Sequence, residues 1–83
     1  MKELFYFLHA TPSEAKQFLE EYQSMAEDNM SKFWIEEDLD AEQAEEEWGS
    51  EVEDPEHRVY LIYGDVSPQD CERMDLEEEW MER

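Results

Sequence analysis

The chain has 83 residues, of which 26 are Asp or Glu and only 6 are Lys or Arg, so its formal net charge at pH 7 is -20. A hydrophobic content of 40% that includes 3 Trp, 4 Tyr and 4 Phe is too apolar for a disordered acidic tail, and it predicts one folded domain spanning residues 1–83. With this charge we expect no direct binding to nucleic acid or to anionic membranes, because phosphate groups would repel the protein.

The expected location is the cytoplasm. The single Cys71 cannot form an internal disulfide, and no signal-like segment is evident. No apolar run approaches the roughly 20 residues that span a bilayer. The composition therefore predicts a soluble protein with a basic partner.

The first part of the chain predicts a strand followed by a helix. Residues 4–8 form a short, aromatic-rich apolar run that is typical of a strand. Thr11 is a suitable N-cap, Pro12 suits the first helical position, and Glu14 completes a capping box. Apolar residues then recur at three- and four-residue spacing as far as Met30, which predicts that one face of this helix packs on the sheet.

The middle of the chain predicts a strand, a short helix and a loop. Residues 33–35 fit either a strand or a continued helix, and we favour the strand. Asp40 is a suitable N-cap for a largely solvated helix that ends at Gly49. Residues 50–56, which include Pro55, are expected to form a loop.

The last part of the chain repeats the order of strand and capped helix. Residues 59–63 read as a strand. Ser67, Pro68 and Asp70 then repeat the pattern of N-cap, Pro and N3 acid seen at the first helix, and they begin a terminal helix that carries Cys71, Met74, Trp80 and Met81. Two strands alone are marginal in water, so the helices must cover the sheet. The predicted fold is α+β: a small two- to three-stranded sheet packed by about three helices in a single domain.

The sequence lacks the spacings of common catalytic and metal sites. His9, His57 and Cys71 do not belong to a C-x-x-C, H-E-x-x-H or E-x-x-H pattern. The acids that begin at Asp38 resemble the start of a calcium loop, but Gln43 stands where its turn glycine belongs. We therefore expect a protein that is not an enzyme and that uses no cofactor and no metal.

The strongest feature is a run of acids between residues 36 and 56. Twelve of these 21 residues are acidic, and no Lys or Arg interrupts them. A solvated helix usually carries Glu–Lys pairs four residues apart, so their absence indicates that this face was not selected for local stability. A second acidic cluster lies near the end of the terminal helix. The predicted partner-binding residues are Glu36, Glu37, Asp38, Asp40, Glu42, Glu45, Glu46, Glu47, Glu51, Glu53, Asp54 and Glu56, with Glu77, Glu78 and Glu79 as the second group.

The size of the charge favours imitation of nucleic acid. B-DNA carries about 18 negative charges over the roughly 30 Å diameter expected of a chain this long. The net charge of -20 matches that value. Such a surface can compete with DNA for a groove lined by Lys and Arg.

In size, charge and the acidic run, the chain resembles the small acidic phage proteins that mimic DNA, which include anti-CRISPR proteins, anti-restriction proteins and inhibitors of uracil-DNA glycosylase. The resemblance implies an inhibitor of a basic nucleic-acid-binding protein, such as a CRISPR effector, a restriction enzyme or a repair enzyme, which would act in the cytoplasm of a bacterial host if the protein is phage-encoded. We expect the protein to be a monomer or a dimer. Among these we prefer an anti-CRISPR protein that blocks target DNA binding by a CRISPR effector.

Three other functions stay open on the sequence. They are the solvated surface of a halophile protein, an acidic chaperone for a basic protein such as a histone, and an inhibitor or adaptor of the transcription machinery. Exposed aromatics discriminate between them, because interfaces are enriched in Trp, Tyr and Met whereas a merely solvated surface is not. Trp34, Trp48 and Trp80 each lie beside acids, and we expect each of them in the core.

Overall fold

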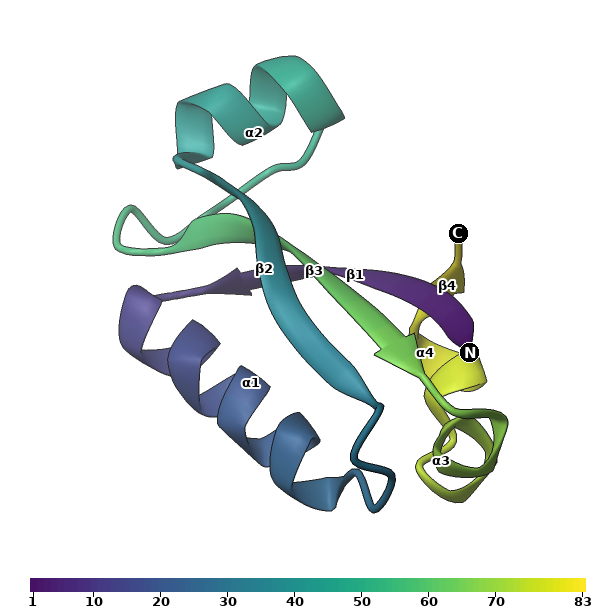
Figure 1. Ribbon diagram of the computed structural model, residues 1–83. Helices are drawn as coiled ribbons and strands as arrows, with labels where there is room; N and C mark the ends of the chain where they lie inside the picture. Colours follow the sequence, from purple (N-terminus) through teal and green to yellow (C-terminus); the bar gives the residue numbers. More distant parts are fainter.

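Four antiparallel strands form one sheet in the order β2-β3-β1-β4 in the computed structural model, which describes residues 1–83 (Figure 1). The central strands are β1 (Lys2–Ala10) and β3 (Arg58–Val66), flanked by β2 (Lys32–Leu39) and the short β4 (Met81–Glu82). Because β1 and β2 both pair antiparallel with β3, α1 (Pro12–Met25) connects two parallel strands that β3 separates. This connectivity is a split βαβ arrangement.

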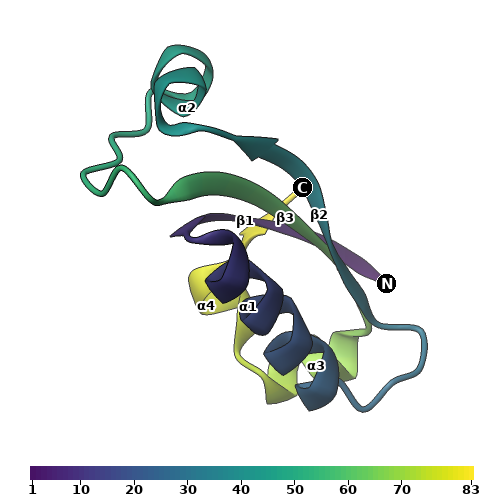
Figure 2. The ribbon, with the colours of Figure 1, turned by 90° about the vertical axis from the view of Figure 1, so that its left-hand side faces the viewer.

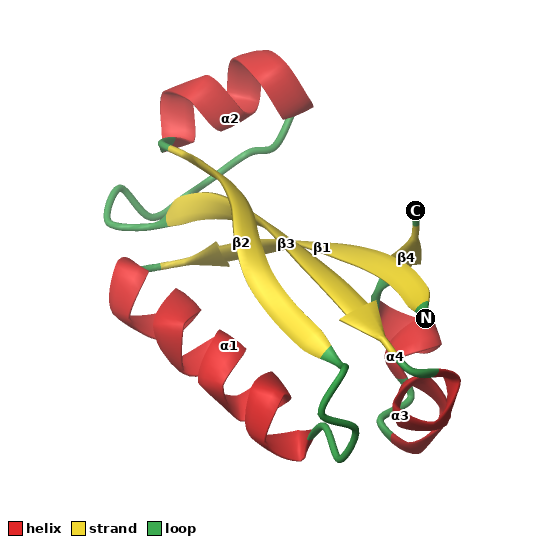
Figure 3. Ribbon diagram, viewed as in Figure 1, coloured by secondary structure: helices red, strands yellow, loops and turns green.

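The helices lie in two places relative to the sheet. One face is covered by α1, α3 (Pro68–Arg73) and α4 (Leu76–Glu79), whereas α2 (Ala41–Trp48) lies at the far end of the β2–β3 pair (Figures 2 and 3). The α+β prediction is confirmed. The sheet has four strands rather than two or three, because residues 81–82 pair with β1, and there are four helices rather than about three.

The core lies between the sheet and the helices that cover it. Alternate residues of the central strands, including Leu4 and Ile62, pack against Ala15 of α1 and Leu76 of α4. Trp80 is 3% exposed at the centre of this layer, which confirms its predicted place in the core. Four rings surround Trp80 at centroid separations from 5.4 to 6.1 Å: Tyr6, Phe18, Tyr22 and Phe33.

The start of α1 follows the sequence prediction, but its end does not. The Thr11 hydroxyl accepts from the Glu14 N–H at 3.2 Å, and the Glu14 carboxylate accepts from the Thr11 N–H at 3.2 Å. The helix ends at Met25, so the expected continuation to Met30 is wrong. The reason is tertiary: the N–H groups of residues 27 and 28 donate to the carboxylate of Asp70, each at 3.1 Å, instead of extending the helix.

The predicted terminal helix is broken into two. Asp75 adopts a left-handed conformation with φ 52°, which no residue maintains inside a right-handed helix. The break lets Trp80 enter the core and places Met81 in β4, so the assignment of both residues to one long helix is wrong. The Ser67 cap is confirmed by a 3.2 Å bond from the N–H of Asp70.

The ambiguous residues 33–35 form a strand, as favoured, but the strand is longer than expected. It runs from Lys32 to Leu39, so Glu36, Glu37 and Asp38 lie on an edge strand. A bulge between Ile35 and Glu37 leaves Glu36 without a partner on β3. No helix in this structure combines the length and the apolar character that crossing a membrane requires.

Candidate partner-binding surface

The acids of segment 36–56 form a continuous exposed stretch over the end of β2, α2 and the following loop. All twelve side chains are exposed, and they belong to elements at one end of the molecule (Figure 1). The exposure of these side chains agrees with the interpretation of this segment as a solvated, charge-bearing surface. Part of the charge lies on a strand, whereas the sequence predicted only helix and loop for it.

Two caps and one aromatic contact hold α2 in place. The carboxylate of Asp40 accepts from the N–H of Gln43 at 2.8 Å, and Gly49 closes the helix in a left-handed conformation with φ 65°. Ala44 is fully buried against the fold, and Trp48 packs on Phe7 of β1 with ring centroids 5.0 Å apart. The small apolar side of α2 thus attaches the helix to the fold, and its charged side is exposed to solvent.

Four of the twelve acids have partners inside the protein. Asp38 accepts from the Arg58 guanidinium at 2.6 Å, and this hydrogen bond raises the pKa of Arg58. Asp54 lies 3.6 Å from the His57 imidazole. Glu36 accepts from the indole N–H of Trp34 at 2.7 Å, and Asp40 caps α2. These four acids stabilise local structure in addition to carrying charge.

The other eight acids have no ion-pair or side-chain hydrogen-bond partner. Acids without a partner in the last turn of α2 also oppose the helix dipole, because that end of a helix carries partial negative charge. Their repulsion is not offset locally, so a basic partner would gain the full interaction with them. These acids are Glu37, Glu42, Glu45, Glu46, Glu47, Glu51, Glu53 and Glu56.

The structure separates the second predicted cluster from the first. Glu77, Glu78 and Glu79 form the first turn of α4, on the sheet face that α1 covers, while α2 lies at the opposite end of the molecule (Figure 2). Glu77 is paired with Lys2, and Glu79 accepts from the Tyr22 hydroxyl at 3.4 Å. The two clusters therefore do not form one continuous surface.

The outer face of the sheet carries aromatic residues that the sequence reasoning missed. Trp34 is 38% exposed on this face, so its predicted place in the core is wrong, and its ring meets that of Tyr63 with centroids 6.0 Å apart. Trp48 is only partly buried, against Phe7. The signal was present in the sequence, because residues 4–8 and 59–63 are apolar at every position and must place rings on both faces.

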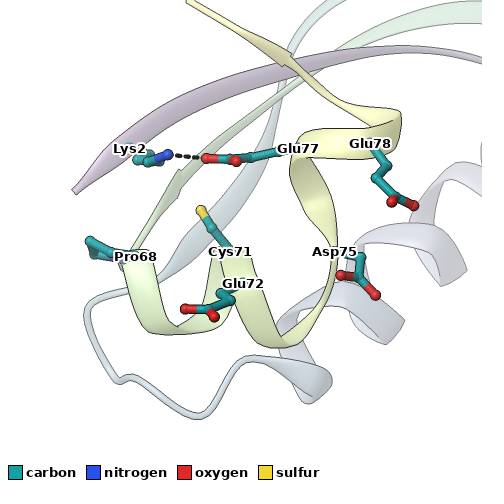
Figure 4. Close-up of a pocket in the computed structure, with 7 residues that line it drawn as sticks. All are labelled: Lys2, Pro68, Cys71, Glu72, Asp75, Glu77 and Glu78. Atoms are coloured by element: carbon teal, nitrogen blue, oxygen red, sulfur yellow. Dashed lines mark hydrogen bonds and ion pairs between the residues drawn. The ribbon is translucent and has the colours of Figure 1, made fainter.

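A pocket of about 440 Å³ lies beside α3 and α4 (Figure 4). Lys2 and Glu77 form an ion pair in its lining, and the sulfur of Cys71 is directed toward them. Cys71 is 3% exposed, and burial raises the pKa of its thiol, which disfavours the nucleophilic thiolate. No group of three or more potential ligand side chains is arranged to hold a metal ion. The pocket thus presents no activated nucleophile.

The chain matches no known protein family, no curated protein and no solved structure.

Proposed function

We propose that this protein is a non-enzymatic mimic of nucleic acid that binds a basic nucleic-acid-binding protein and keeps nucleic acid out of the same groove. The observation that carries the proposal is the set of eight exposed carboxylates without partners on α2, its flanking loop and β2. Acids that stabilised the fold would be paired with the chain's own cations. The eight acids of segment 36–56 are not paired in this way, so their charge is available to a partner.

The dimensions of the protein support this function. Its longest axis is 37 Å, over which B-DNA carries about 22 negative charges. The net charge of the protein is -20, so it offers a Lys/Arg-lined groove a charge similar to that of the DNA it would replace. Long-range attraction of this kind accelerates association, and it weakens as salt screens the charges.

The preferred target is a CRISPR effector, with target DNA binding as the blocked step. This preference rests on the resemblance in size and charge to anti-CRISPR proteins, and restriction and repair enzymes are the next candidates. An acidic chaperone for a basic protein is the alternative function. It predicts binding to a histone-like protein without displacement of DNA from any enzyme.

The test is a competition experiment. Labelled DNA is bound to a CRISPR effector, a restriction endonuclease and a uracil-DNA glycosylase in turn, and its fluorescence anisotropy is followed as the protein is added. The wild type should displace DNA from at least one of them. A variant with Glu45, Glu46 and Glu47 replaced by Lys should lose at least about tenfold in competing power, because several neighbouring charges are reversed.

A matched control separates the position of the charge from its amount. Replacing Glu20, Glu21 and Glu72 by Lys changes the net charge equally, at exposed positions of α1 and α3 away from α2. This control should retain most of the competing power. Equal losses in both variants would show that only net charge matters, and displacement from no enzyme would overturn the proposal.

Two further measurements exclude trivial explanations. Circular dichroism should show that both variants are folded, and Lys in the last turn of α2 should favour the helix, since cations there complement the dipole. The protein alone should not shift labelled duplex DNA at moderate salt, because its charge repels phosphate. A shift by the protein alone would mean that it acts on the DNA directly.

A further inference from the structure

A row of large side chains crosses all four strands on the outer face of the sheet. Met81 of β4 pairs with Phe5 of β1, Phe5 with Tyr63 of β3, and Tyr63 with Trp34 of β2. We call Met81, Phe5, Tyr63 and Trp34 the aromatic row. The packed helices cover the other face, and α2 reaches this face only at its opposite end, where Trp48 contacts Phe7 (Figures 1 and 2).

The row is accessible at both ends. Met81 is 48% exposed and Trp34 is 38% exposed. Burial of these two side chains in the fold therefore does not explain their presence. Met and aromatic residues at accessible positions are typical of surfaces that bind other proteins.

A guanidinium already lies on this row. The guanidinium carbon of Arg83 is 4.8 Å from the centroid of the Tyr63 ring, within the range of a cation–π interaction. The N–H of Arg83 donates to the carbonyl of Glu3 at 2.9 Å, which holds the residue beside β1. The Arg83 side chain forms no ion pair, so the Tyr63 ring is the one group that interacts with its charge.

Carboxylates border the same place. Glu3, Asp65, Trp34, Tyr63 and Arg83 line a small cavity of about 70 Å³. Neither Glu3 nor Asp65 has a cation as an ion-pair partner, although both lie beside the row. The site therefore combines ring faces with carboxylates that have no partner, and these are the two groups that bind a guanidinium.

We propose that the aromatic row is a binding site for an arginine side chain of a basic partner protein, which takes the place of Arg83. Arginine is favoured over lysine because its planar guanidinium stacks on rings and forms paired hydrogen bonds with carboxylates. The site goes beyond the proposed competition with nucleic acid, since it uses the sheet face and not segment 36–56.

The occupant is a protein rather than a single-stranded nucleic acid. Bases also stack on aromatic side chains of open sheets, but such sites combine the rings with a positively charged groove that tracks the phosphates. Here the residues beside the rings include Glu3 and Asp65, and the whole protein carries a charge of -20. A basic peptide fits both the rings and the carboxylates.

The test compares two peptides of the same length and charge, oligo-arginine and oligo-lysine, by titration calorimetry at about 50 mM and about 150 mM salt. The wild type should bind oligo-arginine about two- to fivefold more tightly for each stacked guanidinium. Trp34→Ala should bring the two affinities together. Arg83→Ala should strengthen oligo-arginine binding, because it empties the site, and this exposed change does not disturb the core.

The controls distinguish this proposal from the proposed function. The variant with Glu45, Glu46 and Glu47 replaced by Lys should weaken both peptides alike and keep their ratio, because those acids lie outside the row. If the wild type binds oligo-arginine and oligo-lysine equally tightly, and Arg83→Ala does so too, the arginine site is overturned. Such a result would leave the proposed competition with DNA untouched. Binding of oligothymidine to the wild type would overturn the choice of a protein as the occupant.

Discussion

Asp70 accepts a hydrogen bond from the hydroxyl of Ser31 at 2.8 Å, and both residues are buried, at 2% and 0% exposure. The bond joins α3 to the turn that leads into β2. The same carboxylate accepts from the backbone N–H groups of Glu27 and Asp28 and from Arg73, so it ties the connection between α1 and β2 to α3. These bonds, that from Ser31 foremost, hold the pKa of Asp70 well below its usual range.

Ser31→Ala should lower the free energy of unfolding by about 1–3 kcal/mol, because it leaves a buried N–H without a partner. The Ser31 hydroxyl also accepts from the N–H of Ser67 at 3.1 Å, and alanine cannot replace that acceptor. Urea denaturation measures the effect. The control is Ser24→Ala, which removes a bond on the exposed side of α1 and should change stability by less than about 0.5 kcal/mol. Equal effects of the two changes would show that the buried network adds no stability.

Stability at acid pH should depend on Asp70. Its native pKa is lowered, so the native state binds fewer protons at this group than the unfolded state does. The stabilisation is therefore complete above the ordinary carboxyl pKa of about 4 and is lost as the pH falls below it toward the native value. The stability difference between wild type and Asp70→Asn, from urea denaturation at several pH values, should be constant near neutrality and shrink below about pH 4. A difference that stays constant to pH 2 would contradict the assignment.

Salt should stabilise the protein. Eight acids of segment 36–56 lack partners, and only 6 cations oppose 26 acids in the whole chain, so screening reduces net repulsion in the native state. The melting temperature should rise steadily between about 0.02 M and about 0.5 M NaCl. The variant with Glu45, Glu46 and Glu47 replaced by Lys should show a shallower rise. A flat wild-type curve would mean that the repulsion is already compensated.

Gly64→Ala should destabilise the protein by about 1–3 kcal/mol through overpacking. A Cβ at this position would lie 3.0 Å from the Phe33 ring, which also packs on Trp80 in the core. In a Phe33→Leu background the cost should be smaller, because the obstructing ring is gone, and a double-mutant cycle measures that difference. Independent, additive effects would argue against the contact. Gly49→Ala is a contrasting change, since nothing lies within 4 Å and its cost of about 1 kcal/mol comes from the left-handed backbone.

Features that depend on neighbours along the chain could be predicted from the sequence. The caps at Thr11, Asp40 and Ser67 are bonds between residues three apart, so they form wherever the local pattern occurs. The exposure of the twelve acids in segment 36–56 was equally predictable, because charged side chains are almost never buried unless they are paired. The α+β class followed from the alternation of apolar runs and capped helices.

Features that depend on residues distant in the chain could not be predicted in this way, because they arise from tertiary contacts. Asp70 looked like the acid of a second capping box, but three of its partners, Glu27, Asp28 and Ser31, lie about 40 residues away, and the bonds from Glu27 and Asp28 also end α1 at Met25. Trp34 and Trp80 have similar acidic neighbours in sequence, yet Trp80 lies in the core and Trp34 on the open face. The face that a strand residue occupies depends on which side of the sheet the helices cover, and that is set by strand pairing and by the left-handed turn at Asp75.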